Sequence, residues 1–148
     1  RLISGPCGVA VGTVGAVKVG DKKKWVNLDL STNVLSWAAI LDWYYHAVPV
    51  ENTEREATET VDIVGPLCNS DEIGKQRKMP PLVRGEHVAF LDAGGYVESQ
   101  AARYNAQCFP ATVLVFNELS EITTEREQLR DVSGRFRVPP RLLAQSFS

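Results

Sequence analysis

Short apolar runs that end at glycine or proline recur through this chain of 148 residues. Residues 8–19 are rich in valine and glycine, Gly20-Asp21 marks a turn, and residues 25–30 alternate apolar with polar side chains. Valine favours strands, and alternation on either side of such a turn is typical of a β-hairpin. Further strands are predicted at residues 61–64 and 87–91, and a buried one at residues 111–116.

Helical signals are weak. The aromatic segment at residues 34–46 predicts a short helix or an irregular loop, and residues 125–132 have helical propensity without clear periodicity. Residues 69–81 are charged and end in Pro80-Pro81, so we expect a loop there. The pattern predicts a mainly β fold: an antiparallel or mixed β-barrel of Greek-key type with one or two short helices, formed by residues 1–148 as a single domain.

Composition excludes several classes of protein. Hydrophobic residues make up 44% and charged residues 23%, the profile of a globular domain. The net charge of −2 provides no basic footprint for nucleic acid. No stretch approaches the roughly 20 apolar residues that cross a bilayer. The three cysteines are too few, and odd in number, for a disulfide framework. We therefore expect a soluble, cytoplasmic protein.

Cys68 is the residue best placed for chemistry. It comes just after the predicted strand at residues 61–64 and its Gly65-Pro66 terminator, and polar residues follow it. A thiol in such a place can act as a nucleophile, a proton donor or a metal ligand, whereas a buried cysteine is simply a small hydrophobic residue. No C-x-x-C motif is present, and His46 and His87 lie in dissimilar surroundings, so we expect no metal site.

A second cluster is the sequence Asp92-Ala-Gly-Gly-Tyr96. Paired glycines let a backbone approach a ligand closely, and a tyrosine hydroxyl can bind a phosphate or a carboxylate. The alternative is a hairpin turn with an aromatic ring packed on it.

These motifs occur in a fixed order: Gly65-Pro-Leu-Cys-Asn-Ser70, Arg84-Gly-Glu86, Phe90-Leu-Asp-Ala-Gly-Gly-Tyr96 and Tyr104-Asn105. The order resembles the C-terminal β domain of the fold-type III pyridoxal-phosphate decarboxylases, the diaminopimelate, ornithine and arginine decarboxylase family. The diaminopimelate branch is nearest, because of Gly-Pro-Leu-Cys and Tyr-Asn. Arg1 resembles the arginine that ends the family's E-P-G-R segment. The likeness covers nearly the whole chain.

The resemblance implies that this is part of a larger enzyme. Family members have an N-terminal (β/α)8 barrel, whose lysine holds pyridoxal 5'-phosphate as a Schiff base. We expect this barrel to be absent from the chain, so the chain alone should bind no cofactor and be inactive. The family's active sites form in a homodimer at the subunit interface.

The resemblance also assigns roles. Cys68, contributed by one subunit to its partner's site, would give a proton to the carbon that loses carbon dioxide. A thiol with the ordinary pKa of about 8.5 is protonated at neutral pH and can do so. Tyr96 would hydrogen-bond the cofactor phosphate, with Arg1 nearby. Asn69 and Ser70 would contact the substrate, and Asn105 would support the site.

Two departures bear on the substrate. The family has Glu or Asp after the cysteine, where it binds the substrate's distal amine, but Asn69 carries no charge. The diaminopimelate branch grips a distal carboxylate with an R-P-x-x-Y segment, and residues 37–42 contain no arginine. We therefore expect a small amino-acid-like substrate that is either less charged or attached to a carrier. Trp37, Trp43 and Tyr44 form either an aromatic wall for it or part of the core.

Two other functions remain open. The chain can be a non-catalytic β-barrel module for binding or assembly that kept the scaffold, which the two departures favour. It can also belong to a divergent enzyme with a racemase-like or other reaction on the same cofactor.

Overall fold

The computed structural model describes residues 2–69 and 71–143. Its regular secondary structure is mostly strand, and the chain divides into two compact units, Arg1–Tyr104 and Asn105–Ser148. No helix in the described ranges is long and apolar enough to cross a membrane. Cys7, Cys68 and Cys108 are exposed and form no disulfide with one another.

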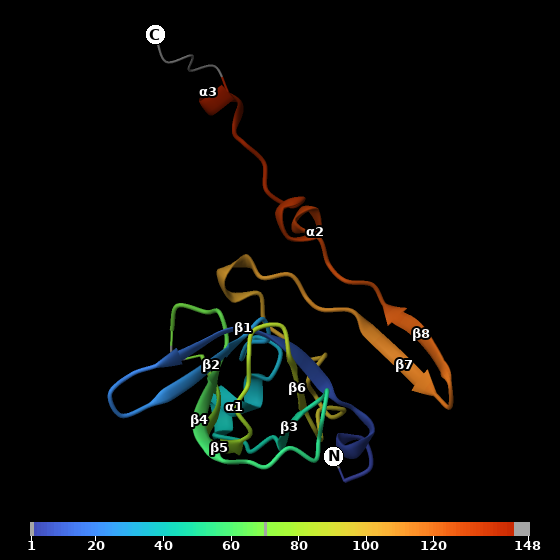
Figure 1. Ribbon diagram of the computed structural model, residues 1–148. Helices are drawn as coiled ribbons and strands as arrows, with labels where there is room; N and C mark the ends of the chain where they lie inside the picture. Colours follow the sequence, from blue (N-terminus) through green and yellow to red (C-terminus); the bar gives the residue numbers. More distant parts are fainter. Residues whose placement is uncertain (1, 70, 144–148) are drawn as a thin grey trace. The chain divides into compact units, whose positions relative to one another are not determined.

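The first unit is a six-stranded mixed sheet (Figure 1). Its elements are a 3₁₀ turn at Gly5–Cys7, β1 (Ala10–Val19), β2 (Lys24–Leu28), α1 (Ser36–Leu41), β3 (Ala47–Pro49), β4 (Glu59–Val64), β5 (Glu72–Met79) and β6 (His87–Phe90). The strand order is β3-β6-β1-β2-β4-β5, and the neighbours are antiparallel except for the parallel pair β2 and β4. The two edge strands, β3 and β5, approach each other, so the sheet is nearly closed into a barrel.

The sheet curls because β1 takes part in two pairings. Residues Ala10 to Thr13 pair with β6, and residues Val14 to Val19 pair with β2. A register shift between Val14 and Ala16 lies at the start of the pairing with β2. Such irregularities increase the local twist of a strand and help a sheet to close.

Inward-facing side chains of these strands, together with those around α1, form one hydrophobic core. Its most buried members are Val14, Val26, Leu28, Leu35, Tyr45, Val61, Ile63, Ile73, Met79, Val88 and Phe90. The alternation predicted for residues 25–30 is confirmed, because Val26 and Leu28 point into this core while Trp25 and Asn27 are only partly buried.

The predicted fold class and the strands near residues 8–19, 25–30, 61–64 and 87–91 are confirmed. The loop predicted at residues 69–81 is wrong, because most of it is β5. Gln76 has a left-handed backbone (φ 48°) and donates its N–H to the Asp62 carboxylate at 2.8 Å, within a strand whose register with β4 shifts twice. This irregularity breaks the alternation by which a strand is recognised in a sequence.

The second unit contains β7 (Thr112–Phe116), β8 (Leu119–Thr124), α2 (Leu129–Ser133) and α3 (Pro140–Leu143). The strands β7 and β8 form an antiparallel hairpin. The strand predicted at residues 111–116 is confirmed, but its predicted burial is wrong: Val115 and Phe116 are exposed. An apolar hairpin of two strands is marginal by itself in water, so this unit needs further packing partners to be stable.

The buried carboxylate of Asp71 organises the turn between β4 and β5. Asp71 is only 4% exposed. Its Oδ1 accepts hydrogen bonds from the Thr32 backbone N–H at 2.7 Å and the Thr32 hydroxyl at 2.6 Å, and its Oδ2 accepts one from the Leu67 N–H at 3.0 Å. Gly65 lies against it, since a Cβ there would be 2.1 Å from Oδ2. The loop from Gly65 to Asp71, which carries Cys68, is thus held by a hydrogen bond from the Leu67 N–H to the carboxylate of Asp71.

Asn33, the residue after Thr32, binds a different segment. Its side-chain Nδ2 donates to the Tyr104 carbonyl at 2.9 Å, and its own carbonyl accepts from the Ala102 N–H at 2.8 Å. Thr32 and Asn33 lie in one turn, closed by hydrogen bonds from the Val34 and Leu35 N–H groups to the Ser31 carbonyl. This turn therefore positions the Cys68 loop and the Tyr104 segment together.

Replacing Asp71 tests this arrangement. Asp71→Asn keeps the size of the side chain but has one acceptor oxygen in place of two, so the N–H of either Thr32 or Leu67 faces an amide NH₂. We expect the free energy of unfolding to fall by about 1–3 kcal/mol in urea denaturation. Asp21→Asn, at an exposed turn, is the matched control and should have no measurable effect. Equal losses in the two variants would contradict the role given to Asp71.

Gly94 allows a second test, because it packs on the segment around the first 3₁₀ turn. A Cβ at Gly94 would lie 2.1 Å from the Ser4 carbonyl oxygen and 2.7 Å from the Gly8 nitrogen, whereas one at Gly15 would have no neighbour nearer than 3.7 Å. Gly94→Ala should therefore cost about 1–3 kcal/mol of stability or more. Gly15→Ala should stay within about 0.5 kcal/mol of wild type. Thermal unfolding of both variants checks this, and a stable Gly94→Ala chain would refute the close contact.

Candidate functional site

Cys68 and Tyr104 meet at the surface of the first unit. Cys68 lies in the loop after β4 and is exposed, as predicted for a thiol with a chemical role. Its Sγ is 3.5 Å from the hydroxyl oxygen of Tyr104, and either atom can be the donor. This hydrogen bond, with the charge that the thiol can carry, raises the pKa of Tyr104 above its ordinary value. The pair thus consists of a thiol beside a phenol that stays protonated at neutral pH.

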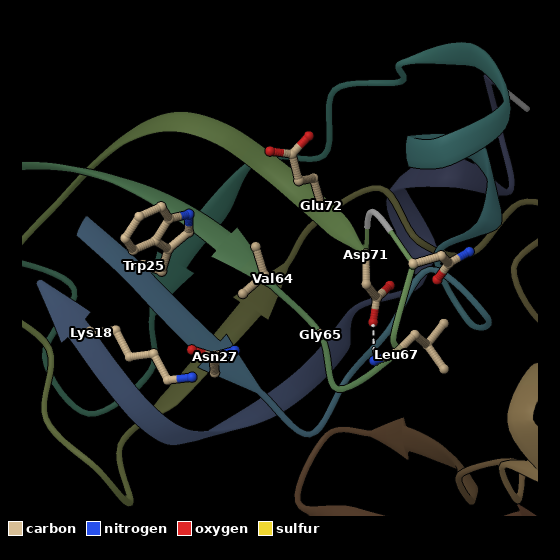
Figure 2. Close-up of a pocket in the computed structure, with 9 residues that line it drawn as sticks. Lys18, Trp25, Asn27, Val64, Gly65, Leu67, Asp71 and Glu72 are labelled. Carbon is tan, nitrogen blue, oxygen red and sulfur yellow. Dashed lines mark hydrogen bonds between the residues drawn. The ribbon is translucent and has the colours of Figure 1, made fainter. Parts of the chain in front are cut away.

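Asn69 is exposed and lines a cavity of about 370 Å³. The other lining residues are Lys18, Trp25, Asn27, Val64, Gly65, Leu67, Asp71 and Glu72 (Figure 2). Figure 2 shows Asp71 turned back to Leu67, so its carboxylate is engaged within the wall. Cys68 is not among the described lining residues, so the structure does not bring Asn69 and Cys68 into one cavity.

Tyr96 belongs to an aromatic cluster on the surface of the same unit. Its ring stacks on Trp37, with centroids 5.1 Å apart and planes 16° from parallel, and Trp43 meets Trp37 edge-on at 6.1 Å. The indole N–H of Trp37 donates to the Gln100 side chain. Tyr96 is 48% exposed, and its hydroxyl has no hydrogen-bond partner among the described residues. A phosphate oxygen could therefore accept from it.

The aromatic segment is not divided cleanly between wall and core, because Trp37 also packs against the hydrophobic core. Trp37 and Trp43 form a partly exposed wall beside Tyr96. The ring of Tyr44 is 3.6 Å from the guanidinium carbon of Arg77, and Tyr44 lines a hollow together with Trp43 and Arg77. Burial lowers the pKa of Arg77, and the cation–π contact with Tyr44 partly compensates for the lost hydration.

The glycines of the Asp92-Ala-Gly-Gly-Tyr96 segment have a structural explanation. The Gly94 N–H donates to the Gly5 carbonyl at 3.0 Å, and the Ala93 N–H donates to the Gly8 carbonyl at 2.9 Å. The close approach that Gly94 permits is therefore to the chain's own backbone. Tyr96, after the turn, is exposed and stacks on Trp37, so it is the member of the segment that stays a candidate for binding.

Other sequence candidates fall in different places. Arg1 and Ser70 lie outside the described residues. Asn105 is the first residue of the second unit. His87 pairs with Glu51, whose carboxylate is 2.6 Å from the His87 Nδ1 and whose pKa this contact lowers. No cluster of His, Cys, Asp and Glu side chains within the described ranges could hold a metal ion.

The sequence reasoning missed the positions of Tyr104 and Asn33 in this site. Tyr104 was part of a motif without an assigned role, and Asn33 carried no signal at all. Asn33 is buried, as are Ser31 and Thr32 beside it. A run of small polar residues directly after an apolar strand could have indicated a buried hydrogen-bonding turn.

Comparisons with known proteins agree with this architecture. Residues 5–94 match the family described as pyridoxal-dependent decarboxylase, C-terminal sheet domain. The diaminopimelate decarboxylase of Archaeoglobus fulgidus is 33% identical over 144 residues, which are 97% of this chain and 34% of that protein. That of Neisseria meningitidis serogroup B is 36% identical over 130 residues, 87% of this chain and 31% of that protein.

Solved structures give the same result. The crystal structure of diaminopimelate decarboxylase from M. jannaschii superposes with a TM-score of 0.87 at 31% identity, covering 93% of this chain and 32% of that one. The chain thus spans about a third of the length of the relatives that it matches. The sequence motifs, the barrel-like sheet and these matches agree, and the chain belongs to the pyridoxal-dependent decarboxylase family, as its C-terminal sheet domain.

Proposed function

We propose that this chain completes the active site of a pyridoxal-phosphate-dependent amino-acid decarboxylase, with Cys68 as the proton donor. The observation that carries the proposal is the exposed Cys68 thiol, presented on a loop that is fixed through Asp71 and placed 3.5 Å from the Tyr104 hydroxyl. The family membership gives this thiol a reaction in which a proton donor is required.

The cofactor fits the residues that are described. When bound, pyridoxal 5'-phosphate supplies the electron sink that lets an amino acid lose carbon dioxide. Tyr96 offers a hydroxyl without a partner among the described residues, on a ring held by Trp37. It would donate a hydrogen bond to a phosphate oxygen. The remaining contacts would come from the rest of the protein, so the chain by itself would bind no cofactor.

The step assigned to Cys68 is a proton transfer to carbon. The S–H bond breaks as a C–H bond forms at the carbon that has lost carbon dioxide, and a thiolate remains. A thiol serves well here because it is protonated at neutral pH yet acidic enough to release its proton. The thiolate then recovers a proton from solvent before the next turnover.

The substrate would be an amino acid without the two distal charges of diaminopimelate, or one attached to a carrier. Asn69 is neutral and exposed, so it offers a distal ammonium no counter-ion. Trp37 lies in the segment where an arginine was expected and presents an aromatic surface beside Tyr96. Such a wall favours apolar or uncharged groups over a carboxylate.

Two partners would complete the protein. One is an N-terminal (β/α)8 barrel, because the relatives are about three times as long as this chain. The other is a second copy of the whole protein, since Cys68 would act in the site of the partner subunit. We infer a homodimer with two shared sites.

Replacing the thiol tests the proton-donor role. In the full-length protein, Cys68→Ala should keep the visible absorbance of the bound cofactor while kcat falls by about 100-fold or more. The product formed in D₂O should lose its stereochemical purity at the protonated carbon, as read by NMR. Cys108→Ala is the matched control and should behave as wild type. Unchanged rate and stereochemistry in Cys68→Ala would refute the role, and a full-length protein that binds no cofactor would favour a binding or assembly module.

Restoring the family's charge tests the role of Asn69. Asn69→Glu should raise kcat/KM for a substrate with a distal ammonium by about 30-fold, which corresponds to ~2 kcal/mol for a charge-assisted hydrogen bond. Asn69→Gln has the same shape without the charge and should give no such gain. Steady-state kinetics with diaminopimelate and with an amino acid of neutral side chain measure the change. An equal response to Glu and Gln would remove Asn69 from substrate recognition.

A further inference from the structure

One turn of the fold supports both Cys68 and Tyr104 and thereby brings the two side chains into contact. Thr32 binds Asp71, which holds the Leu67 N–H at the base of the Cys68 loop. Asn33 binds the carbonyl of Tyr104 itself and the N–H of Ala102. The distance between thiol and phenol is therefore set by buried hydrogen bonds, although both side chains are exposed.

We propose that Tyr104 is a positioning residue for Cys68: its hydroxyl donates a hydrogen bond to the sulfur and stabilises the thiolate left when the proton has gone to carbon. The inference rests on the proposed function of Cys68. The Tyr104 hydroxyl is hydrogen-bonded to the sulfur. It acts through Cys68.

The protonation states are consistent with this direction of donation. The hydrogen bond to Cys68 raises the pKa of Tyr104, so the phenol keeps its proton through the neutral range. A protonated phenol beside a thiolate can only be the donor. Hydrogen bonds to an ionised acceptor are stronger than neutral ones, so the contact favours the thiolate over the thiol.

Cys68, Tyr104 and solvent together account for every proton in this step. Cys68 transfers its proton from sulfur to carbon, and the Tyr104 O–H then points to the thiolate. Tyr104 is 47% exposed, so water can reach the pair and return a proton to the sulfur. No oxidant, metal or further acid is needed.

Two charged side chains lie on the segments that carry the pair. Asp71 and Arg103 are the charged side chains on the segments 67–71 and 102–104 that carry the two residues. The carboxylate of Asp71 is engaged by Thr32 and Leu67. Asn33 and Asn69 are neutral. Replacing the Tyr104 hydroxyl alone leaves all of them in place.

The test measures Cys68 directly in the full-length holoenzyme. Iodoacetamide alkylation is followed across pH, with each cysteine resolved by peptide mass spectrometry. In Tyr104→Phe, the Cys68 alkylation rate at near-neutral pH should fall by about three- to tenfold and its pH midpoint should move upward, because the thiolate loses a donor. Cys7 and Cys108 in the same sample are internal controls and should not change.

A second variant separates the hydroxyl from the ring. Tyr104→Ala removes both, so a role of the ring in packing predicts a change in Tyr104→Ala and none in Tyr104→Phe. A Tyr104→Phe curve that superposes on wild type overturns the inference. A shifted Tyr104→Phe curve supports it, and it does so even where Cys68→Ala leaves the product stereochemistry unchanged. A shifted Tyr104→Phe curve together with unchanged stereochemistry in Cys68→Ala would refute the proposed function of Cys68 but support the thiol–phenol contact. Failure of the proposed function is therefore distinguishable from failure of the inference about Tyr104.

Discussion

The candidate site depends on the hydrogen bonds that the buried carboxylate of Asp71 accepts. Taking a charge out of water is costly unless hydrogen bonds replace the lost hydration. Asp71 receives three, from the Thr32 N–H, the Thr32 hydroxyl and the Leu67 N–H. Gly65 is required beside it, because any Cβ would collide with the carboxylate. The loop that presents Cys68 therefore has one conformation in which its polar groups are satisfied, and the sheet fixes where that loop begins and ends.

The residues after Thr32 extend this order to the second half of the site. Asn33 is buried and uses both its side chain and its carbonyl to hold residues 102–104. A functional side chain on a loop is useful when a rigid scaffold fixes the loop. Here a single turn fixes two loops that are more than 30 residues apart in the chain. Cys68 and Tyr104 stay exposed to solvent, while the groups that position them are buried.

The sequence predicted the parts of the fold that local patterns encode. The alternation around Val26 and Leu28 identified β2, and Gly65-Pro66 marked the end of β4. The irregular strand β5 was missed because Gln76, in a left-handed conformation, interrupts its period. Ordered motifs single out Cys68, Tyr96 and Asn69 as candidates, and their roles stay predictions. The meeting of Cys68 with Tyr104, and the cavity that joins Asn69 to Lys18 and Trp25, depend on tertiary contacts that no local pattern contains.

The two positions at which this chain departs from the family pattern, Asn69 and the segment around Trp37, are constrained by the fold to different degrees. Asn69 is exposed within the Cys68 loop, which Asp71 already holds, so a change at this position costs the fold little. Trp37 is packed between Tyr96 and Trp43 and bonded to Gln100, so its replacement alters the support of Tyr96 as well. A neutral residue at 69 can therefore be exchanged alone, whereas an aromatic residue at 37 must change together with its neighbours. Under the proposed function, Cys68 and Tyr96 would keep the chemistry while substrate recognition varied around them.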